Sequence, residues 1–499
     1  MDISNQNLDT TEITVRNNSK TNAKNLWKED DDNEYQIHAT IFSTESDETF
    51  SFFKKVNIMD LEKRKEVYGV CGECNEPGTG WHWCQPCNAK RFKENFKNWT
   101  SGNKNIDELI QKSQLNAFFY VKCLEWIPFE KFDNVTYLTR GGFSKIYSAD
   151  WPEGNIWYWD IENQKWDRNP RKVALKSLNN SSNISNDFLN EINYYISGHI
   201  HASNTVMCFG ITQDPNTKDY MMVLQYFEGG NLRNILVEDS KLETKIKYLF
   251  CIIDGLSGIH DAGNIHKDFH SGNILYNNHN DLLSISDLGM CQPVNDNERK
   301  GIYGVIPYMA PEVLRGYKYT KAADIYSFGI IMNELMSEEI PYNDIPHDHF
   351  LGVKICKGFR PKISEDTPKL IVDLIIKCWD AKAENRPTAK ELCQTFLRYG
   401  NDMDDENSEI SYQIKECEKI KVNKLKNRTN ENKSKNLQIH PQAIYTSRLL
   451  KFENLPEPVN STNYLSSFQE PISSSSANLI SECLDYESNE LDLNQDDDE

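Results

Sequence analysis

The stretch from residue 266 to residue 273 constrains the fold of this chain more than any other feature. It reads His-Lys-Asp-Phe-His-Ser-Gly-Asn, so Asn273 follows Asp268 by five residues. The apolar segment Asn273–Tyr276 comes next, and Asp287 then precedes a Leu-Gly pair. Phosphoryl transfer needs from a protein mainly a base at the attacking hydroxyl and ligands for Mg²⁺. An acidic turn alone is common, but the two elements in this order indicate such a site.

Length and charge bound the kinds of protein that this chain can be. At 499 residues it is too long for one hydrophobic core, so we expect several domains or one domain with tails. Its apolar content of 38% is low for a globular protein, which indicates that part of the chain is unpacked. The net charge of −20 argues against a protein that coats nucleic acid. It does not argue against a nucleotide site, which local charges and bound cations can build.

Targeting signals and membrane segments are not expected in this sequence. The first residues lack the basic and apolar regions of a signal peptide. No apolar run approaches the roughly 20 residues that span a bilayer. We therefore expect an intracellular protein of the cytoplasm, with a nuclear location left open and no membrane partner. In such a reducing compartment the thirteen cysteines are not expected to form disulfides.

Composition changes along the chain and predicts its organisation. A weak strand is compatible with the stretch between Tyr35 and Phe53, inside an otherwise polar N-terminal region. The expected parts are a mostly disordered segment 1–65, a cysteine module 66–90, a helical linker 91–131, a globular domain 132–400, and a low-complexity, mostly disordered tail 401–499.

Further motifs follow one another within residues 132–400. The segment Val173–Lys176 reads Val-Ala-Leu-Lys, and Glu191 lies fifteen residues after the lysine in a helical pattern. An Ala-Pro-Glu sequence ends at Glu312, and Asp324 and Arg386 stand further on. In this order the motifs resemble a eukaryotic protein kinase domain. The nearest group is the tyrosine-kinase-like Ser/Thr kinases found in expanded fungal families, and the resemblance covers a little over half of the chain.

The resemblance implies an α+β, bilobal protein-kinase fold. Its small lobe would hold a five-stranded antiparallel sheet with one helix, its large lobe would be mainly helical, and ATP would bind between them. Glu312 and Arg386 would pair, and Asp324 would hold the catalytic-loop backbone, all as structural contributions. The segment from Trp151 to Trp166 would form an elongated hairpin in the small lobe.

The resemblance also implies roles for individual site residues. Asp268 would be the base, and Asn273 and Asp287 would hold Mg²⁺. Lys176 would contact the α- and β-phosphates of ATP and would itself be held by Glu191. An exposed surface pair of the last two residues, worth less than about 1 kcal/mol, is the alternative. The downstream carboxylates favour the catalytic pair.

The nucleotide contacts implied by the resemblance lie on the glycine-rich loop, on three strands and in the hinge between the lobes, with Leu224 at the gatekeeper position. They are Gly141, Gly142, Ile146, Ala174, Lys176, Leu224, Gln225, Phe227 and Leu275. The glycine-rich loop departs from the family pattern, because Thr139 and Ser144 occupy its first and third glycine positions. Glycine lets backbone amides approach phosphates without a Cβ in the way. We therefore expect weakened ATP binding.

The core motif itself has three departures. Lys267 replaces an arginine and lacks the bidentate fork that binds a phosphorylated activation segment. The activation segment here is the stretch from Asp287 to Glu312. His270 stands where most Ser/Thr kinases have a lysine, and Val305 replaces the threonine that bonds that lysine. Between Asp287 and Glu312 there is no Ser or Thr. We expect activation that does not depend on Ser/Thr phosphorylation there, with Tyr303 as the alternative, and Ser/Thr against Tyr specificity stays open.

A separate cysteine module precedes the kinase-like region. Cys71 and Cys74 form one C-x-x-C pair, and Cys84 and Cys87 form another after nine intervening residues. Four thiolates suit a tetrahedral Zn²⁺ ion, so the pattern predicts a structural zinc site. A redox-active pair and chance proximity are the alternatives, and His82 is a further candidate ligand. The basic and aromatic residues between Lys90 and Trp99 could serve a partner or nucleic acid, but a solvated helix face is favoured.

Two functions from different classes compete. The leading interpretation is an ATP- and Mg²⁺-dependent protein kinase in intracellular signalling, Ser/Thr-directed, with a protein substrate and an unknown partner for the zinc module. The alternative is a pseudokinase scaffold that binds partners through its kinase and zinc-module surfaces. The altered glycine loop, Lys267 and His270 favour the scaffold, and the complete set of lysine, base and metal ligands favours the enzyme. Binding of nucleic acid is the least favoured interpretation.

Overall fold

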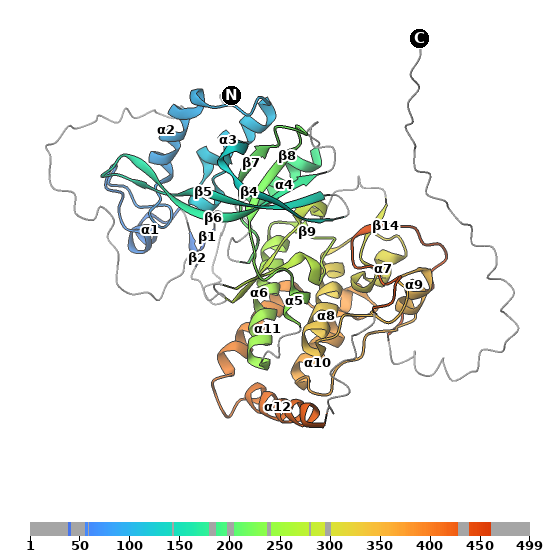
Figure 1. Cartoon of the computed structure of the whole chain (residues 1–499). Coiled ribbons are helices and arrows are strands. Elements are labelled where there is room, and N and C mark those ends of the chain that lie inside the picture. The colour runs from blue at the N-terminus through green and yellow to red at the C-terminus, as the bar shows by residue number, and fades with distance from the viewer. Residues whose placement is uncertain are drawn as a thin grey trace, which may run out of the picture.

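The computed structural model describes residues 38–40, 55–57, 59–141, 144–178, 186–196, 204–236, 241–278, 281–294, 301–427 and 439–460. Figure 1 shows a small lobe built on a twisted sheet and a large lobe made mostly of helices. The chain between residues 59 and 131 lies against the small lobe. Most of the predicted N-terminal segment 1–65 falls outside the described residues.

The sheet of the small lobe has six strands, not the predicted five. Its order is β3-β7-β8-β6-β5-β4, with bounds β3 Glu125–Trp126, β4 Asp133–Arg140, β5 Ser144–Asp160, β6 Lys165–Leu178, β7 Cys208–Gln213 and β8 Tyr220–Gln225. The additional strand β3 pairs parallel with β7. Gly210 permits this approach, because a Cβ there would stand 2.1 Å from the Glu125 carbonyl oxygen. An ion pair also holds β3 in place, because Arg168 donates hydrogen bonds to the two oxygens of the Glu125 carboxylate at 2.9 and 2.8 Å.

Strands β5 and β6 extend far beyond the lobe as a long antiparallel hairpin, which confirms the elongated hairpin predicted between Trp151 and Trp166. The pairing shifts register between Trp151 and Asn155. Gly154 lies there with φ +69°, and a Cβ would overlap the Asn169 carbonyl group. A glycine is therefore required at this irregularity in the pairing of the two strands.

The strands and α-helices that precede β3 form the N-terminal part of the described chain. They are β1 His38–Thr40, β2 Lys55–Asn57, α1 Leu61–Tyr68, α2 Gln85–Asn95 and α3 Lys104–Asn116. The predicted helical linker is thus two helices, separated at residues 99–103. Trp83 and Phe92 form a small apolar cluster with Ile156 and Trp166 of the hairpin. Helix α3 contributes Ile106 and Ile110 to the main core, where they join the buried side of helix α4, Asn186–Ile196.

The large lobe is helical around one extensive apolar core. Its helices are α5 Leu232–Ile235, α6 Leu242–Asp261, α7 Pro311–Leu314, α8 Lys321–Ser337, α9 His349–Cys356, α10 Lys369–Cys378 and α11 Ala389–Asp402. Short strand pairs lie at its upper edge: β9 Asn264–Ile265 with β12 Gln292–Pro293, and β10 Ile274–Asn277 with β11 Leu282–Ile285.

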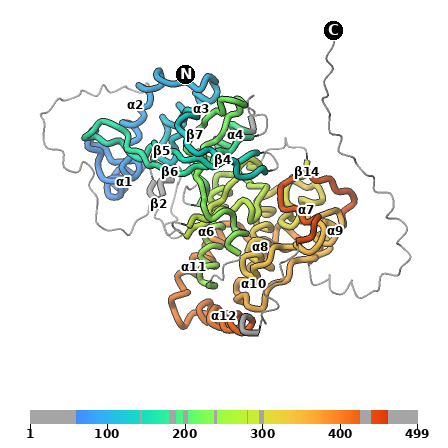
Figure 2. The backbone as a smooth tube through the Cα atoms, viewed as in Figure 1, coloured from blue at the N-terminus to red at the C-terminus, as the bar shows by residue number. Residues whose placement is uncertain are grey.

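The range 401–499 contains two ordered stretches where a mostly disordered tail is predicted. Helix α12, Glu409–Asn427, continues below α11 (Figure 2) and buries Ile410 and Ile414 in the main core. Residues 439–460, which we name the strap, cross the large lobe and carry strand β14, Arg448–Leu450. This strand pairs with β13, Ile302–Gly304. Both stretches owe their order to contacts with the large lobe, which composition does not reveal.

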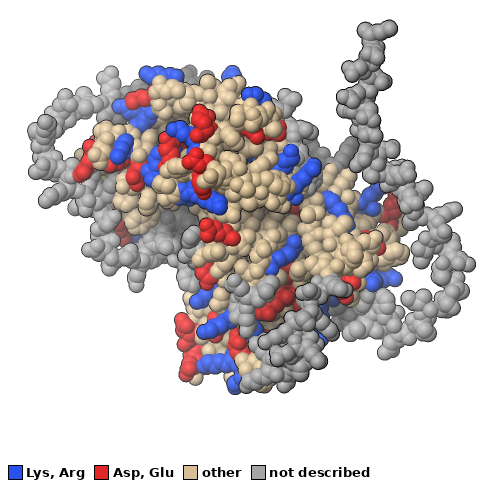
Figure 3. Space-filling model, viewed as in Figure 1, with Lys and Arg blue, Asp and Glu red and all other residues tan. Residues whose placement is uncertain are grey.

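Charged side chains of both signs are mixed over the face of the molecule seen in Figure 3. Within the described residues, no helix has the length and apolar character required to cross a lipid bilayer.

Candidate functional site

Three charged groups from three different elements meet at the boundary between the lobes. The Nζ of Lys176 on β6 donates to Glu191 Oε1 at 2.5 Å and to Asp287 Oδ1 at 2.8 Å. Helix α4 presents Glu191 because Phe188, Ile192 and Tyr195 recur at helical spacing and bury the same side of the helix. The predicted ion pair is present, and the lysine and glutamate are almost fully buried, not at the surface.

The electrostatics of this triad favour the charged lysine. Burial opposes its charge, but the attraction of Asp287 and Glu191 raises the pKa of Lys176 above its ordinary value. Desolvation favours protonated Asp287, yet the positive charge of Lys176 lowers the pKa of that carboxyl group. Burial dominates at the third group and raises the pKa of Glu191.

Gly289 is required by the approach of helix α4. A Cβ on this residue would stand 2.9 Å from Glu191 Oε2 and 3.3 Å from Asp287 Oδ1. The Asp-Leu-Gly sequence therefore combines an acidic group with a residue small enough for the triad to close around it. Asp287 itself has a left-handed backbone, with φ 58°, a conformation that aspartate tolerates better than most residues.

The hairpin of β10 and β11 brings Asn273 and Asp287 to one end. Ile274 lies opposite Ile285, so the residues just outside the hairpin face each other. The main chain confirms this, because the Ser286 N–H donates to the Asn273 carbonyl at 2.8 Å. One short hairpin, β10 and β11, therefore accounts for the sequence separation between Asn273 and Asp287.

Asp268 lies in a loop whose backbone is held by Asp324 of α8. The Asp324 carboxylate accepts from the N–H groups of His266 at 2.8 Å and Lys267 at 3.0 Å. The side chain of Asn273 donates to the Asp268 carbonyl at 2.9 Å. Asp268 is buried, and its Oδ1 atom has no hydrogen-bond partner among the described residues. Such an oxygen is costly unless a donor reaches it.

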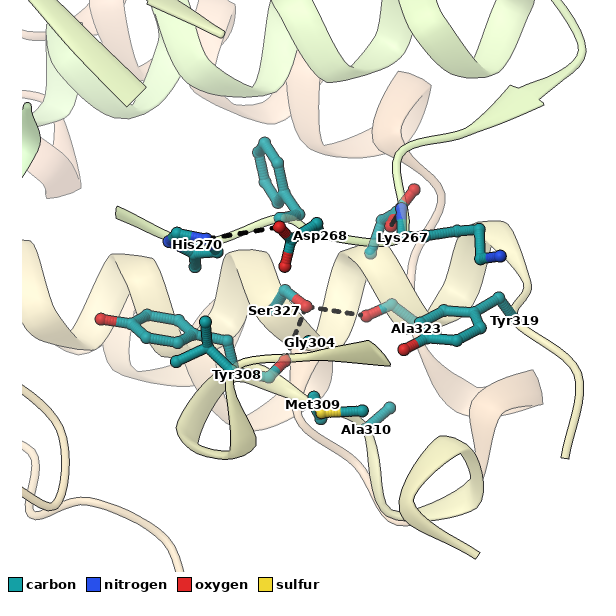
Figure 4. A pocket seen from close by; sticks show the side chains of 13 residues that line it. Lys267, Asp268, His270, Gly304, Tyr308, Met309, Ala310, Tyr319, Ala323 and Ser327 are labelled. Atoms are coloured by element: carbon teal, nitrogen blue, oxygen red, sulfur yellow. Dashed lines mark hydrogen bonds and ion pairs between the residues drawn. The ribbon is translucent and has the colours of Figure 1, made fainter. Parts of the chain in front are cut away.

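His270 faces the other carboxylate oxygen of Asp268. Its Nε2 lies 3.7 Å from Asp268 Oδ2, as Figure 4 shows by a dashed line. Its Nδ1 accepts from the Gly272 N–H at 3.1 Å, so the neutral ring carries its proton on Nε2. The histidine that replaces the expected lysine therefore still directs an N–H group toward Asp268.

A small pocket adjoins Asp268 and is walled by the activation segment. Its lining includes Val305. Figure 4 labels three further lining residues, Gly304, Tyr308 and Tyr319. Val305 is buried. The Ser327 hydroxyl donates to the Tyr308 carbonyl at 2.6 Å and ties this wall to α8.

Lys267 contacts the activation segment without a phosphate group. Its Nζ donates to Gln292 Oε1 at 2.9 Å and lies 5.0 Å from the centre of the Tyr319 ring. The predicted pair that ends the segment is also formed, because two Arg386 nitrogens donate to the two Glu312 oxygens at 2.6 and 2.8 Å. The segment thus has protein partners at its beginning and at its end.

Most residues expected to contact the nucleotide lie on neighbouring strands. Ile146 is paired with Lys176, and Ala174 is paired with Leu224. Gln225 ends β8, buried Phe227 follows it, and Leu275 lies on β10 of the large lobe. Gly141 is described and donates its N–H to the Ser144 carbonyl at 2.8 Å. Gly142 lies outside the described residues.

The four cysteines of the N-terminal module form one cluster. The sulfur atoms of Cys71, Cys74, Cys84 and Cys87 all lie within 4.8 Å of one another, and those of Cys74 and Cys84 are 3.6 Å apart. A tetrahedral Zn²⁺ ion with Zn–S bonds of about 2.3 Å requires sulfur separations of about 3.8 Å. The donor set and the spacing therefore fit zinc. Hydrogen bonds from the Cys84 and Cys87 thiols lower the pKa of Cys71, as expected where sulfur atoms crowd together.

The contacts that connect the linker to α4 were not predicted from the sequence. Lys122 is buried, and its Nζ donates to the Tyr195 carbonyl at 3.2 Å. Gln114 of α3 donates to the Leu124 carbonyl at 2.8 Å. A lysine in a short turn gave no signal of burial in the sequence. The Lys122 bond ties the helix that carries Glu191 to the linker, and the Gln114 bond holds α3 to the segment that leads into β3.

Comparisons with known proteins identify relatives of this chain among the kinases. Three similar proteins are described as kinases. They are a probable serine/threonine-protein kinase of Dictyostelium discoideum (26% identical over 265 residues, 51% of this chain and 18% of that protein), the putative mitogen-activated protein kinase kinase kinase 7-like protein of Drosophila melanogaster (34% over 193 residues, 36% and 48%), and the serine/threonine-protein kinase VIK of Arabidopsis thaliana (28% over 271 residues, 52% and 57%). The chain spans about a fifth of the first and about half of the other two.

A family model gives the wider match. The model described as protein tyrosine and serine/threonine kinase matches residues 132–396, more than half of the 499 residues. The match begins directly before β4 of the small lobe and runs into α11 of the large lobe. The chain therefore belongs to the family of protein tyrosine and serine/threonine kinases.

Proposed function

We propose that this chain is an active protein kinase of the tyrosine-kinase-like type, which transfers the γ-phosphoryl group of ATP to Ser or Thr hydroxyls of proteins. The observation that carries the proposal is the unpartnered Oδ1 of buried Asp268. A substrate hydroxyl is the donor that this oxygen lacks. Asp268 accepts the proton of that hydroxyl as the phosphoryl group is transferred. His270 and Asn273 hold the carboxylate in place from its other side.

The residues of the triad fit the phosphates of ATP and the Mg²⁺ that accompanies them. Mg²⁺ would supply positive charge that neutralises the phosphate groups. Asn273 and Asp287 would hold it, since both offer the hard oxygen ligands that Mg²⁺ prefers. The Asp287 side chain is 41% exposed, so its carboxylate is accessible from the cleft. Lys176 attracts the α- and β-phosphates, and Glu191 keeps its charged group in place.

Adenine would bind to the apolar surface between the lobes. Ile146, Ala174 and Leu224 from the sheet and Leu275 from the large lobe form its two sides, and the backbone from Gln225 to Phe227 offers hydrogen bonds to the base. The names of the similar proteins support the preference for Ser and Thr. They do not identify the substrate of this chain.

The test is transfer of radiolabelled phosphate from ATP to a generic protein substrate by the full chain and by Asp268→Asn. Loss of a base that takes part in proton transfer lowers the rate by about two to four orders of magnitude. We expect a loss in this range with unchanged ATP affinity. Equal transfer by both chains would refute the base assignment. Absence of transfer from the unmodified chain, with ATP still bound, would favour the scaffold function.

We also propose that the four-cysteine cluster holds a structural Zn²⁺ ion. Its support is the sulfur geometry and the packing of Trp83, next to Cys84, on the hairpin of β5 and β6. A protein partner would bind the outer surface of this module, and the whole chain would act in the cytoplasm. Metal analysis of the purified chain tests the ion, with one zinc per chain as the expected result.

A further inference from the structure

The strap, residues 439–460, lies beside the candidate site on the large lobe, where Figure 1 shows β14 next to α7 and α9. Its strand β14 is antiparallel to β13, with Gly304 opposite Arg448 and Ile302 opposite Leu450. Gly304 also lines the pocket around Asp268. The strap therefore covers a segment that a protein substrate would have to pass on its way to the base.

The pairing has the form in which proteins bind extended peptides. Strands β13 and β14 make a two-stranded sheet of their own. When a peptide adds to a strand edge, main-chain bonds give affinity and alternate side chains enter pockets. Side chains of the strap alternate between buried and exposed in this way. Leu450 is 9% exposed and packs in the main core, whereas Leu449 is 60% exposed. The activation segment thus holds the strap as it would hold a peptide ligand.

The direction of the strap carries hydroxyl groups toward the pocket. In an antiparallel pair, the residue before Arg448 continues past Gly304 toward Val305, another pocket residue. That residue is Ser447, and Thr446 precedes it. The Ser447 Oγ atom is buried and makes no hydrogen bond in the part of the chain that the structure describes. The strap thus resembles a substrate in having a hydroxyl at the pocket end of its strand.

The part of the strap before β14 is anchored by Tyr445 and its neighbours. The Tyr445 hydroxyl donates to the Pro341 carbonyl at 2.8 Å, and the Arg233 guanidinium lies 4.7 Å from the centre of its ring. The His347 ring stands edge-on to Tyr445, also at 4.7 Å, and the His347 N–H donates to the Gln442 carbonyl at 3.0 Å.

The part of the strap that follows β14 is anchored by contacts of its own. Two Arg315 nitrogens donate to the Glu457 carboxylate. The Val459 N–H donates to the Cys356 carbonyl of α9 at 2.9 Å. Asn460 Oδ1 accepts from the Ala381 N–H at 2.8 Å. The strap is therefore fastened at both ends, and these anchors all lie on the large lobe.

We propose that the strap occupies the protein-substrate groove of its own kinase domain as a substrate-like inhibitor. The proposal rests on the proposed function. A competing occupant lowers the apparent affinity for a protein substrate in proportion to the fraction of molecules whose groove is open. ATP binding is left unchanged, because none of the proposed nucleotide contacts lies in the strap or on β13. The lysine–glutamate pair is already formed, so release of the strap is the step that exposes an assembled site.

The test compares two leucine variants of the full chain. Leu450→Ser removes the buried side chain of β14, and Leu449→Ser makes the same change at the exposed neighbour. We expect kcat/KM for a protein substrate to rise about tenfold in Leu450→Ser if the strap is docked in about nine molecules of ten, with Leu449→Ser unchanged. The Kd of ATP should be equal in both. Equal or lower kcat/KM in Leu450→Ser would overturn the proposal.

Hydrogen exchange of the amides of residues 302–304 gives a readout that does not require activity. The amides should exchange faster in Leu450→Ser than in Leu449→Ser, and equal exchange would overturn the docking of the strap. If no chain transfers phosphate, the proposed kinase function fails, while the exchange result still decides whether the strap is docked as described.

A second variant covers the case in which Leu450→Ser does not fold, as a melting curve would reveal. Glu457→Lys reverses the charge of a side chain that is 79% exposed, opposite Arg315. Glu457→Lys should also raise kcat/KM, but by a smaller factor than Leu450→Ser, because exposed ion pairs are weak. The swapped chain, Arg315→Glu with Glu457→Lys, should return to the original value. No rise in Glu457→Lys would count against inhibition by the strap.

Discussion

His270 and Asp268 face each other with Nε2 and Oδ2 only 3.7 Å apart, and a backbone N–H fixes the tautomer of the histidine. The chain thus keeps a donor beside the proposed base although the expected lysine is absent. A neutral imidazole exerts less attraction on a phosphate than a lysine does. Its main contribution is therefore the orientation of the carboxylate.

Replacement of His270 should consequently affect turnover more than nucleotide binding. We expect His270→Ala to lower kcat on the order of tenfold, with KM for ATP changed less than about twofold, because the lost contact orients the base. Steady-state kinetics with varied ATP measure both constants. The matched control is His82→Ala, since His82 lies in the N-terminal cysteine module, where its ring contacts Tyr158 of the hairpin. Equal kcat in the two variants would contradict the orienting role.

Loss of the buried lysine should destabilise the small lobe. Lys176→Met leaves Glu191 buried without its cation, and breaking a buried pair costs about 3–5 kcal/mol. Lys131→Met removes a lysine from an exposed pair with Glu153 and should cost less than about 1 kcal/mol. Urea denaturation followed by tryptophan fluorescence measures both. The double variant Lys176→Met with Glu191→Leu should recover part of the loss.

Zinc removal should unfold the N-terminal module while the large lobe stays folded. Structural Zn²⁺ contributes on the order of 10 kcal/mol to small domains that depend on it. Cys74→Ser should therefore lose the ion and expose the buried Trp83, which a red shift of tryptophan emission would report. Cys393→Ser lies outside the cluster and is the matched control. Full zinc content in Cys74→Ser would contradict the site.

The burial of Lys122 should make stability depend on pH. Burial lowers the pKa of Lys122 to about 7. Between this value and the ordinary lysine pKa the unfolded chain binds more protons, so stability rises with pH, by at most about 1.4 kcal/mol per pH unit. Lys122→Met lacks this dependence. Its advantage over the unmodified chain should be largest near pH 6.5 and should shrink by pH 8.5, as denaturation at both values would show.

A constant difference between the two chains across this pH range would contradict the lowered pKa. Other titrating groups are shared by both chains, so the comparison isolates the lysine. The same variant should increase hydrogen exchange at the end of α4, because the bond to the Tyr195 carbonyl is lost.

Local sequence patterns predicted the elements whose partners are close in the chain or typical of the kinase family. The ion pair of Lys176 and Glu191, the hairpin ending at Trp166 and the proximity of the four cysteines all follow from such patterns. The sixth strand did not, because its two residues depend on a glycine more than eighty positions away at 210. The order of the strap was missed for the same reason. A stretch such as Ile444–Leu450 has no periodicity of its own, and its structure depends on contacts with distant parts of the large lobe.

Because β13 and β14 belong to one chain, their pairing does not depend on how much protein is present. A tethered segment meets its site at an effective concentration of the order of millimolar when the linker is short and flexible. A separate protein must therefore bind more tightly than the strap, or be present above this effective concentration, before it occupies the pocket beside Asp268. Dilution would leave this competition unchanged, whereas a ligand that captures the strap itself would remove it.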